Sequence, residues 1–398
     1  MPIERIRSGE FTVPPQGHRY LALDALRGMA AFAVFFYHWQ MNENGQPRSG
    51  EISAFASGYL AVDLFFMLSG FVISHAYGER LQISMSVREF MIARFIRLQP
   101  VIAIGTLIGF TLAFSQRLFG LEGAPGFFAI LTALPANFFM LPDVFVPWGI
   151  FLFNPPAWSL FYELVANAVY AIGVRAYEGR NSRSENAGRN VDMPFGRALV
   201  GLCLVSFAGL ILSVVYSGNL DRGVALKDWP IALSRVFFSF TLGILLHRGR
   251  SAWMMHTPRL PLSCLLFTCP ALFIPELIGS SRAVYDLIFV SVMCPALIML
   301  TAVIEPHPSL EKIAVWLGMI SFPLYAVHAP IKHVLEAYLP ANFALLLLIS
   351  TCSTILIAWV VGSVIDPVLR RWLTIRFDGL KLARSPSAIL PSSVSGET

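Results

Sequence analysis

The sequence predicts an all-α polytopic membrane protein, and three observations support this fold class. Of the 398 residues, 56% are hydrophobic and only 13% are charged, whereas soluble domains carry about 25% charged residues. Apolar runs long enough to cross a bilayer recur from one end of the chain to the other. The mean hydropathy is +0.65. The net charge of +5 is accounted for by arginines in loops, so a nucleic-acid partner is not expected.

Eleven apolar runs are candidate membrane spans. They are 20–40, 57–77, 97–116, 125–141, 155–175, 196–216, 229–247, 260–278, 283–304, 313–334 and 341–364. Arginines cluster in the loops 78–97, 176–197 and 248–259 and after residue 365, and such clusters favour the cytoplasm. All four arginine clusters can lie in the cytoplasm only if one of the eleven runs does not cross the membrane.

The run 125–141 is the weakest and contains Pro135, so we expect it to be the one that does not cross. The prediction is about ten transmembrane helices plus one re-entrant or short helix, with both termini in the cytoplasm. Residues 1–19 form a cytoplasmic segment, 20–365 the membrane domain, and 366–398 a cytoplasmic tail with a disordered end. The first run carries Asp24 and Arg27 and lacks a cleavage site, so it is not expected to be a signal peptide.

The first apolar run, LDALRGMAAFAVFFYH, carries a cation and an imidazole on one face. Arg27 and His38 are eleven residues apart, which is about three helical turns and roughly 16 Å along the axis. Charged groups inside a span are costly and usually line a polar path. We therefore expect the Arg27–His38 face to line a cavity. The alternative is that Arg27 only pairs with Asp24 and that His38 is an interfacial histidine.

Further polar residues inside the runs separate into two groups. By the topology above, the outer half holds His38, Asp63, Ser159, Glu163, Tyr325 and His328, and the cytoplasmic mouth holds Arg94 and Arg97. Asp63 and Glu163 could each be a structural partner of an arginine, and His328 could be a packed histidine. All five cysteines lie in apolar runs, so neither a disulfide framework nor a metal site is expected.

Five stretches in order resemble the membrane acyltransferase-3 family of bacterial O-acyltransferases. They are LDALRGMAAFAVFFYH, GYLAVDLFFMLSGFVIS, REFMIARFIRLQPV, NPPAWSLFYELVAN and ISFPLYAVHAPI. Two positions depart from the family pattern: Ala93 stands where a second arginine is common, and Pro323 where a small polar residue is common. The chain resembles the stand-alone form, without a fused extracytoplasmic domain.

The resemblance implies transfer of an acyl group, most often acetyl, from acyl-CoA to a hydroxyl, in the inner (plasma) membrane. Acyl-CoA is then a co-substrate, and no permanently bound cofactor is expected. The expected partners are acyl-CoA, membrane lipid and a carbohydrate acceptor such as lipopolysaccharide or an exopolysaccharide. The acceptor could also be a small secondary metabolite such as a macrolide.

The charge layout fits the same chemistry. Arg94 and Arg97 could hold the CoA phosphates, with Arg27 deeper in. His38 is the candidate base for the acceptor hydroxyl, because imidazole titrates near neutrality. Its ring could be oriented by Asp63 or Glu163. Ser159, Tyr325 and His328 are candidates for binding the oxyanion or the acceptor. Two other functions remain open, a proton-coupled transporter and a lipid-linked glycosyltransferase.

Overall fold

The computed structural model describes residues 19–40, 55–181, 192–269, 273, 281–339 and 342–383. Within these ranges the chain forms helices and no strand. The α-helices are α1 (Leu21–Gln40), α2 (Ala61–Ile83), α3 (Val87–Leu118), α4 (Phe127–Phe138), α5 (Ala157–Asn181), α6 (Asp192–Ser217), α7 (Trp229–Arg248), α8 (Arg250–Trp253), α9 (Leu262–Thr268), α10 (Arg282–Ile288), α11 (Cys294–Ala302), α12 (Pro308–Tyr338), α13 (Phe343–Val360) and α14 (Asp366–Ala383). Short 3-10 turns, η1 (Gly58–Leu60) and η2 (Leu226–Asp228), precede α2 and α7, and π-turns, η5 (Phe289–Met293) and η6 (Val361–Ile365), follow α10 and α13.

Nine stretches of helix in the described part of the chain are long and apolar enough to cross a membrane, which confirms a polytopic all-α protein. The predicted run 125–141 forms only the 12-residue α4, about 18 Å long and too short to span the hydrocarbon core. Of the predicted run 260–278, the structure describes one seven-residue helix, α9, and four further residues. The tenth crossing and the cytoplasmic position of both termini therefore stay predictions.

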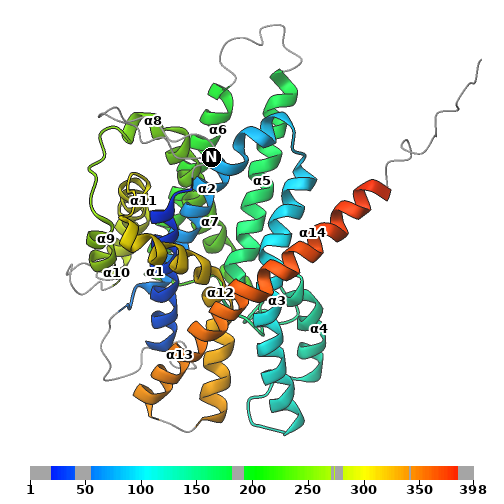
Figure 1. Ribbon diagram of the computed structural model, residues 1–398. Coiled ribbons are helices and arrows are strands. Elements are labelled where there is room, and N and C mark those ends of the chain that lie inside the picture. The colour runs from blue at the N-terminus through cyan, green and yellow to red at the C-terminus, as the bar shows by residue number, and fades with distance from the viewer. Residues whose placement is uncertain are drawn as a thin grey trace, which may run out of the picture.

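The core of the bundle is formed by two closely packed helix pairs, α1 with α12 and α2 with α7 (Figure 1). Glycines make both close approaches possible. A Cβ added at Gly28 of α1 would lie 2.6 Å from the Leu317 Cβ, and one at Gly318 of α12 would lie 2.6 Å from the Asp24 Cβ. The first helix, with its Arg27–His38 face, is thus held against α12.

The helix that carries Arg94 and Arg97 begins at a complete capping box. Ser86 accepts a hydrogen bond from the Glu89 backbone N–H at 3.2 Å, and the Glu89 side chain accepts one from the Ser86 N–H at 3.0 Å. This cap fixes the start of α3. The first turns of the helix then bring both arginines to the cavity described below.

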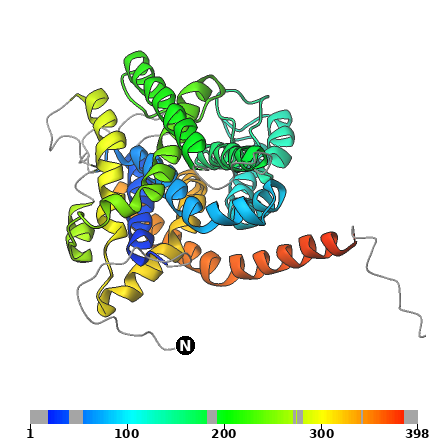
Figure 2. The same ribbon diagram turned by 90° about the horizontal axis from the view of Figure 1, so that it is seen from above.

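The last helices continue into the predicted tail. α13 passes through the π-turn η6 into α14, so residues 366–383 are helical. Figures 1 and 2 both show α14 leaving the bundle at an angle. Exposed apolar residues recur at helical spacing from Val364 in η6 to Val368, Trp372 and Ile375 in α14. The predicted disordered end of the tail, beyond residue 383, lies outside the described residues.

Candidate functional site

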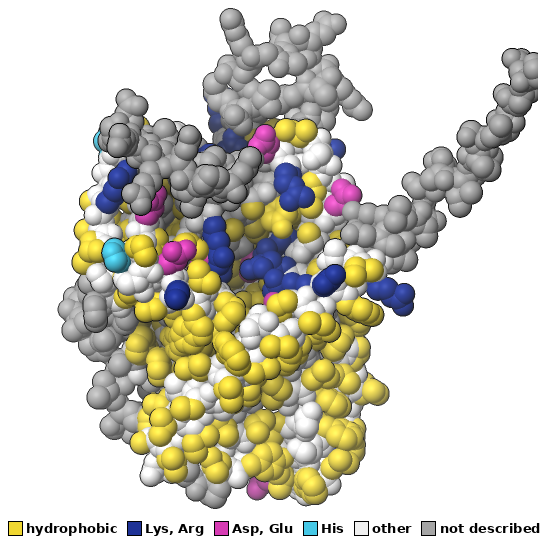
Figure 3. All heavy atoms as spheres, viewed as in Figure 1, with side chains coloured by type: hydrophobic (Ala, Val, Ile, Leu, Met, Phe, Trp, Pro, Cys, Tyr) yellow, Lys and Arg dark blue, Asp and Glu magenta, His cyan; other side chains and the backbone are white. Residues whose placement is uncertain are grey.

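A cavity of about 770 Å³ lies among α1, α2, α3, α5 and α12. This volume is within the range of small-molecule binding sites. Figure 3 shows Lys and Arg side chains gathered in a hollow, above a surface of mostly hydrophobic side chains. Six of the nine predicted site residues line the cavity: Arg27, Arg94, Arg97, Ser159, Glu163 and Tyr325.

The cavity has a strongly basic mouth. The predicted Arg97 is exposed there, and so are Arg19 and Arg80, which were not among the predicted site residues. Arg80 also lies over the ring of Tyr77, 5.5 Å from its centroid. Three exposed guanidinium groups around one opening make a site suited to phosphate.

Arg27 is tethered between α1 and α12. Its guanidinium donates to Asp24 Oδ1 at 2.8 Å, to Ser321 Oγ at 3.0 Å and to the Gly318 carbonyl at 3.2 Å. The Asp24–Arg27 pair considered from the sequence therefore forms. The Arg27 side chain nevertheless lines the cavity and is 28% exposed, so it can still meet a ligand.

Glu163 forms a buried ion pair with Arg94 on the cavity wall. Arg94 Nη2 lies 2.8 Å from Glu163 Oε1, and the same oxygen accepts from Ser69 Oγ at 2.6 Å. Arg94 Nε is buried and has no hydrogen-bond partner among the described residues. A buried guanidinium N–H without a partner is costly, which indicates a water or ligand atom beside it.

Two hydroxyl groups meet in the buried part of the cavity wall. Ser159 Oγ and the Tyr325 hydroxyl lie 2.7 Å apart, and each lies 3.0 Å from the carbonyl oxygen of Pro156. Both side chains are nearly fully buried, whereas the arginines at the mouth are exposed. The basic and hydroxyl groups thus occupy different depths of one cavity.

The two predicted histidines, His38 and His328, form a pair beside Tyr325. His328 Nε2 lies 3.2 Å from His38 Nδ1. His38 Nδ1 lies 2.9 Å from the Val34 carbonyl, and His328 Nδ1 lies 2.7 Å from the Tyr325 carbonyl. Since a carbonyl only accepts, the hydrogen-bond network assigns a proton to each Nδ1. The single His38 Nδ1–H is then shared between the Val34 carbonyl and His328 Nε2, and His38 Nε2 carries a lone pair.

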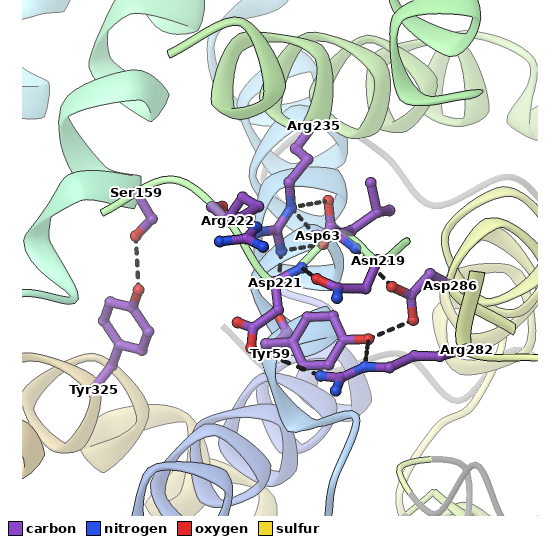
Figure 4. A network of polar contacts seen from close by, with 11 residues as sticks. Tyr59, Asp63, Ser159, Asn219, Asp221, Arg222, Arg235, Arg282, Asp286 and Tyr325 are labelled. Atoms are coloured by element: carbon purple, nitrogen blue, oxygen red, sulfur yellow. Dashed lines mark hydrogen bonds and ion pairs between the residues drawn. The ribbon is translucent and has the colours of Figure 1, made fainter. Parts of the chain in front are cut away.

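Asp63 contacts Arg235 and not the His38 ring that it was expected to orient. Arg235 Nη2 is 2.5 Å from Asp63 Oδ2, and both side chains are at most 1% exposed. Figure 4 shows this pair within a polar network of α2, α7 and α10. Asp63 and Glu163 are thus both partners of arginines. Among the described residues, the His38 ring nitrogen is hydrogen-bonded to Val34 and His328, and neither Asp63 nor Glu163 makes the predicted orienting contact.

Three residues of the network in Figure 4 were not among the predicted site residues: Arg235, Asp286 and Arg282. Arg235 and Asp286 are single charges inside the apolar runs 229–247 and 283–304, and such charges are themselves a signal of a polar site. Among the described residues, no group of three or more His, Cys, Asp or Glu side chains is arranged to hold a metal ion.

Comparison with known proteins places the chain in a family. A family model described as an acyltransferase domain, acyltransferase-3, matches residues 20–363. The chain is 36% identical over 168 residues to "Protein 2 in picA locus" of Rhizobium radiobacter, which covers 40% of this chain and 83% of that protein. It is 29% identical over 166 residues to acyltransferase MdmB of Streptomyces mycarofaciens, 41% of each chain.

A shorter match joins the chain to YrhL of Bacillus subtilis (strain 168), whose name proposes a peptidoglycan O-acetyltransferase. The two are 37% identical over 91 residues, which is 21% of this chain and 12% of YrhL. No solved structure matches. Because the family model covers most of the chain and nine described stretches of helix are long and apolar enough to cross a membrane, the protein belongs to the acyltransferase-3 family and is a multi-pass membrane acyltransferase.

Proposed function

We propose that the protein transfers an acyl group, acetyl in the simplest case, from acyl-CoA to a hydroxyl of a cell-surface or lipid-linked carbohydrate, in the inner membrane. The observation that supports this most directly is the cavity, which has arginines at its mouth and a buried hydroxyl pair in its wall. Acyl-CoA carries its groups in a matching order. Its charged phosphates lie at one end of a narrow arm and its thioester at the other.

In this proposal the donor enters from the basic mouth. Arg97, Arg19 and Arg80 bind the phosphates, and Arg27 meets the arm deeper in. Arg94 contributes its unpartnered Nε–H, while Glu163 and Ser69 hold its guanidinium in place. Arginine suits this task because it stays charged and binds phosphate with two parallel hydrogen bonds.

The reaction then takes place near Tyr325. His38 Nε2 removes the proton from the acceptor hydroxyl while the hydroxyl oxygen attacks the thioester carbonyl carbon. Ser159 and Tyr325 donate to the negative charge that develops on the carbonyl oxygen. The C–S bond breaks, the CoA thiolate leaves, and the proton held by His38 passes to its sulfur. The products are the ester and free CoA.

His328 has a positioning role in this proposal. Together with the Val34 carbonyl, it accepts the His38 Nδ1–H and so fixes the tautomer in which Nε2 is free to act as the base. Neither histidine lines the donor cavity; they lie behind Tyr325, whose ring centroid is 5.8 Å from that of His328. Tyr325 therefore has to move for acceptor and donor to meet.

Binding and transfer can be tested separately with the full chain in lipid nanodiscs. Arg97→Ala should weaken CoA binding about tenfold or more in calorimetry, since it removes a charged phosphate contact. Arg117→Ala, an exposed arginine at the far end of the same helix, is the matched control and should bind CoA normally. An Arg97→Ala variant with unchanged CoA affinity would remove Arg97 from the donor site.

Transfer itself is tested with acetyl-CoA labelled in the acetyl group. Membranes that contain the protein should place base-labile label on carbohydrate, and membranes without it should not. A proton-coupled transporter would attach no label to any glycan, so complete absence of labelled glycan would contradict the proposed reaction.

A further inference from the structure

A second polar site lies at the end of α1 away from the donor cavity. Asp24 and Arg27, near the start of α1, line the cavity. At the other end, the Tyr37 hydroxyl donates to Asp221, which belongs to the segment between α6 and η2. Tyr37 directly precedes His38, and their ring centroids are 5.3 Å apart. Whatever binds at Asp221 is therefore held close to the proposed base.

The segment that carries Asp221 is fixed by buried contacts on both sides (Figure 4). Arg235 Nη1 donates to the Arg222 carbonyl at 2.9 Å, and the Leu220 N–H donates to Asp286 Oδ2 at 2.7 Å. The Tyr59 hydroxyl donates to the other oxygen of Asp286 at 2.5 Å. A carboxylate on so constrained a segment is pre-organised, which lowers the entropic cost of binding.

Asp221 and Arg282 are the partly open members of this network. Their side chains are 35% and 40% exposed, whereas Asp63 and Arg235 are almost completely buried. Arg282 is held by its Nε–H bond to the Tyr59 hydroxyl at 3.1 Å and by the face of the Tyr59 ring, 4.8 Å from its guanidinium carbon. Arg282 Nη2 lies 3.7 Å from Asp221 Oδ2, too far for a hydrogen bond.

The two side chains therefore offer unused hydrogen-bonding capacity next to each other. Among the described residues, Asp221 Oδ1 has no hydrogen-bond partner, and neither terminal nitrogen of Arg282 donates a hydrogen bond. An acceptor oxygen beside guanidinium donors complements neighbouring hydroxyl groups, since each hydroxyl both donates and accepts. A phosphate or carboxylate ligand would instead face the negative charge of Asp221.

We propose that Asp221 and Arg282 bind the acceptor substrate, a neutral polyhydroxylated carbohydrate, and present it to His38. This inference rests on the proposed function, and it assigns the acceptor to the end of α1 opposite the acyl-CoA cavity. Tyr37 and Tyr59 are positioning residues, because their hydroxyls hold Asp221 and Arg282 without being exposed themselves.

The test uses the full chain in fluorescent nanodiscs on an array of neutral and acidic glycans. Asp221→Asn and Arg282→Gln remove the charges at similar size, and the asparagine oxygen can still accept from Tyr37. Each variant should lose at least about tenfold in binding to the neutral glycans that the unmodified chain binds. Arg222→Gln is the matched control: its side chain is exposed on the same segment, and Arg235 uses only its carbonyl.

Each outcome decides the proposal. Loss in both variants, with binding retained in Arg222→Gln, supports it. Equal binding by all four proteins, binding to acidic glycans only, or no binding to any neutral glycan overturns it. CoA affinity, measured on the same samples, should be the same in every variant. If the unmodified chain does not bind CoA, the proposal that acyl-CoA is the donor is wrong. The proposed acceptor site is tested separately, by binding to the glycan array.

Discussion

At the scale of single residues, His38 is the group on which the proposed reaction depends most. General-base catalysis typically contributes a factor of about 10²–10⁴. His38→Ala should therefore lower acetyl transfer by at least about a hundredfold, while CoA affinity and the elution profile of the protein stay normal. His256→Ala, at an exposed histidine after α8, is the control and should retain full activity. Normal transfer by His38→Ala would remove the imidazole from the mechanism.

The buried pair Asp63–Arg235 leads to a prediction about stability. Removing one member leaves a charge without a partner in the protein interior, at a cost of about 3–5 kcal/mol. Asp63→Leu and Arg235→Met should each lower the thermal midpoint in detergent strongly. The double variant should recover part of the loss, because no charge is left over, although the carbonyls of Tyr59 and Arg222 lose their donor. Additive losses in the double variant would contradict a direct coupling.

At the scale of elements, the packing of α2 against α7 depends on two glycines. A Cβ added at Gly70 would collide with the Phe240 carbonyl, and one at Gly243 with the Met67 carbonyl. Gly70→Ala should therefore force the two helices apart and cost about 1–3 kcal/mol, measured as a lower thermal midpoint. Gly201→Ala on α6 is the matched control, since a Cβ there meets open space. If both variants had equal midpoints, the close approach would not limit stability.

The helix α12 combines two functions that require different local properties. Its first half packs against α1 through Gly318, while its second half carries Tyr325 and His328 between Pro323 and Pro330. Each interior proline removes one backbone hydrogen bond from the helix. The stretch between them is therefore the part of α12 best suited to the movement of Tyr325 that the proposed transfer requires.

At the scale of the whole molecule, the two proposed sites lie at opposite ends of α1 and should be reachable from opposite sides of the membrane. In a chain whose five cysteines have been replaced, Arg80→Cys at the donor mouth should react with a membrane-impermeant thiol reagent only in inverted vesicles. Arg222→Cys should react only in intact cells. Labelling of both positions from the same side would contradict a transfer across the bilayer.

The membrane class, the short helix at 125–141 and six of the polar residues that line the cavity could be predicted from the sequence, for a common physical reason. Hydrophobic length and intramembrane charge are local properties, so Arg27, Arg94 and Glu163 stand out without any knowledge of their neighbours. Which side chains form an ion pair, in contrast, is not a local property of the sequence. Asp63 meets Arg235 across 172 residues, and Glu163 meets Arg94 across 69. The role first expected for these carboxylates depended on which helix would face them, and only the three-dimensional packing determines that.

The separation of Asp63 from Arg235 along the chain also matters during biosynthesis. At about 5–20 residues per second, the ribosome needs roughly 10–35 s to make the 172 residues between them. Throughout that interval the nascent second span carries an acid with no counter-ion, at a cost of about 2.5 kcal/mol or more in lipid. It should stay near the translocon until the arginine-bearing span emerges, and chains truncated before that point should be cleared by membrane proteases.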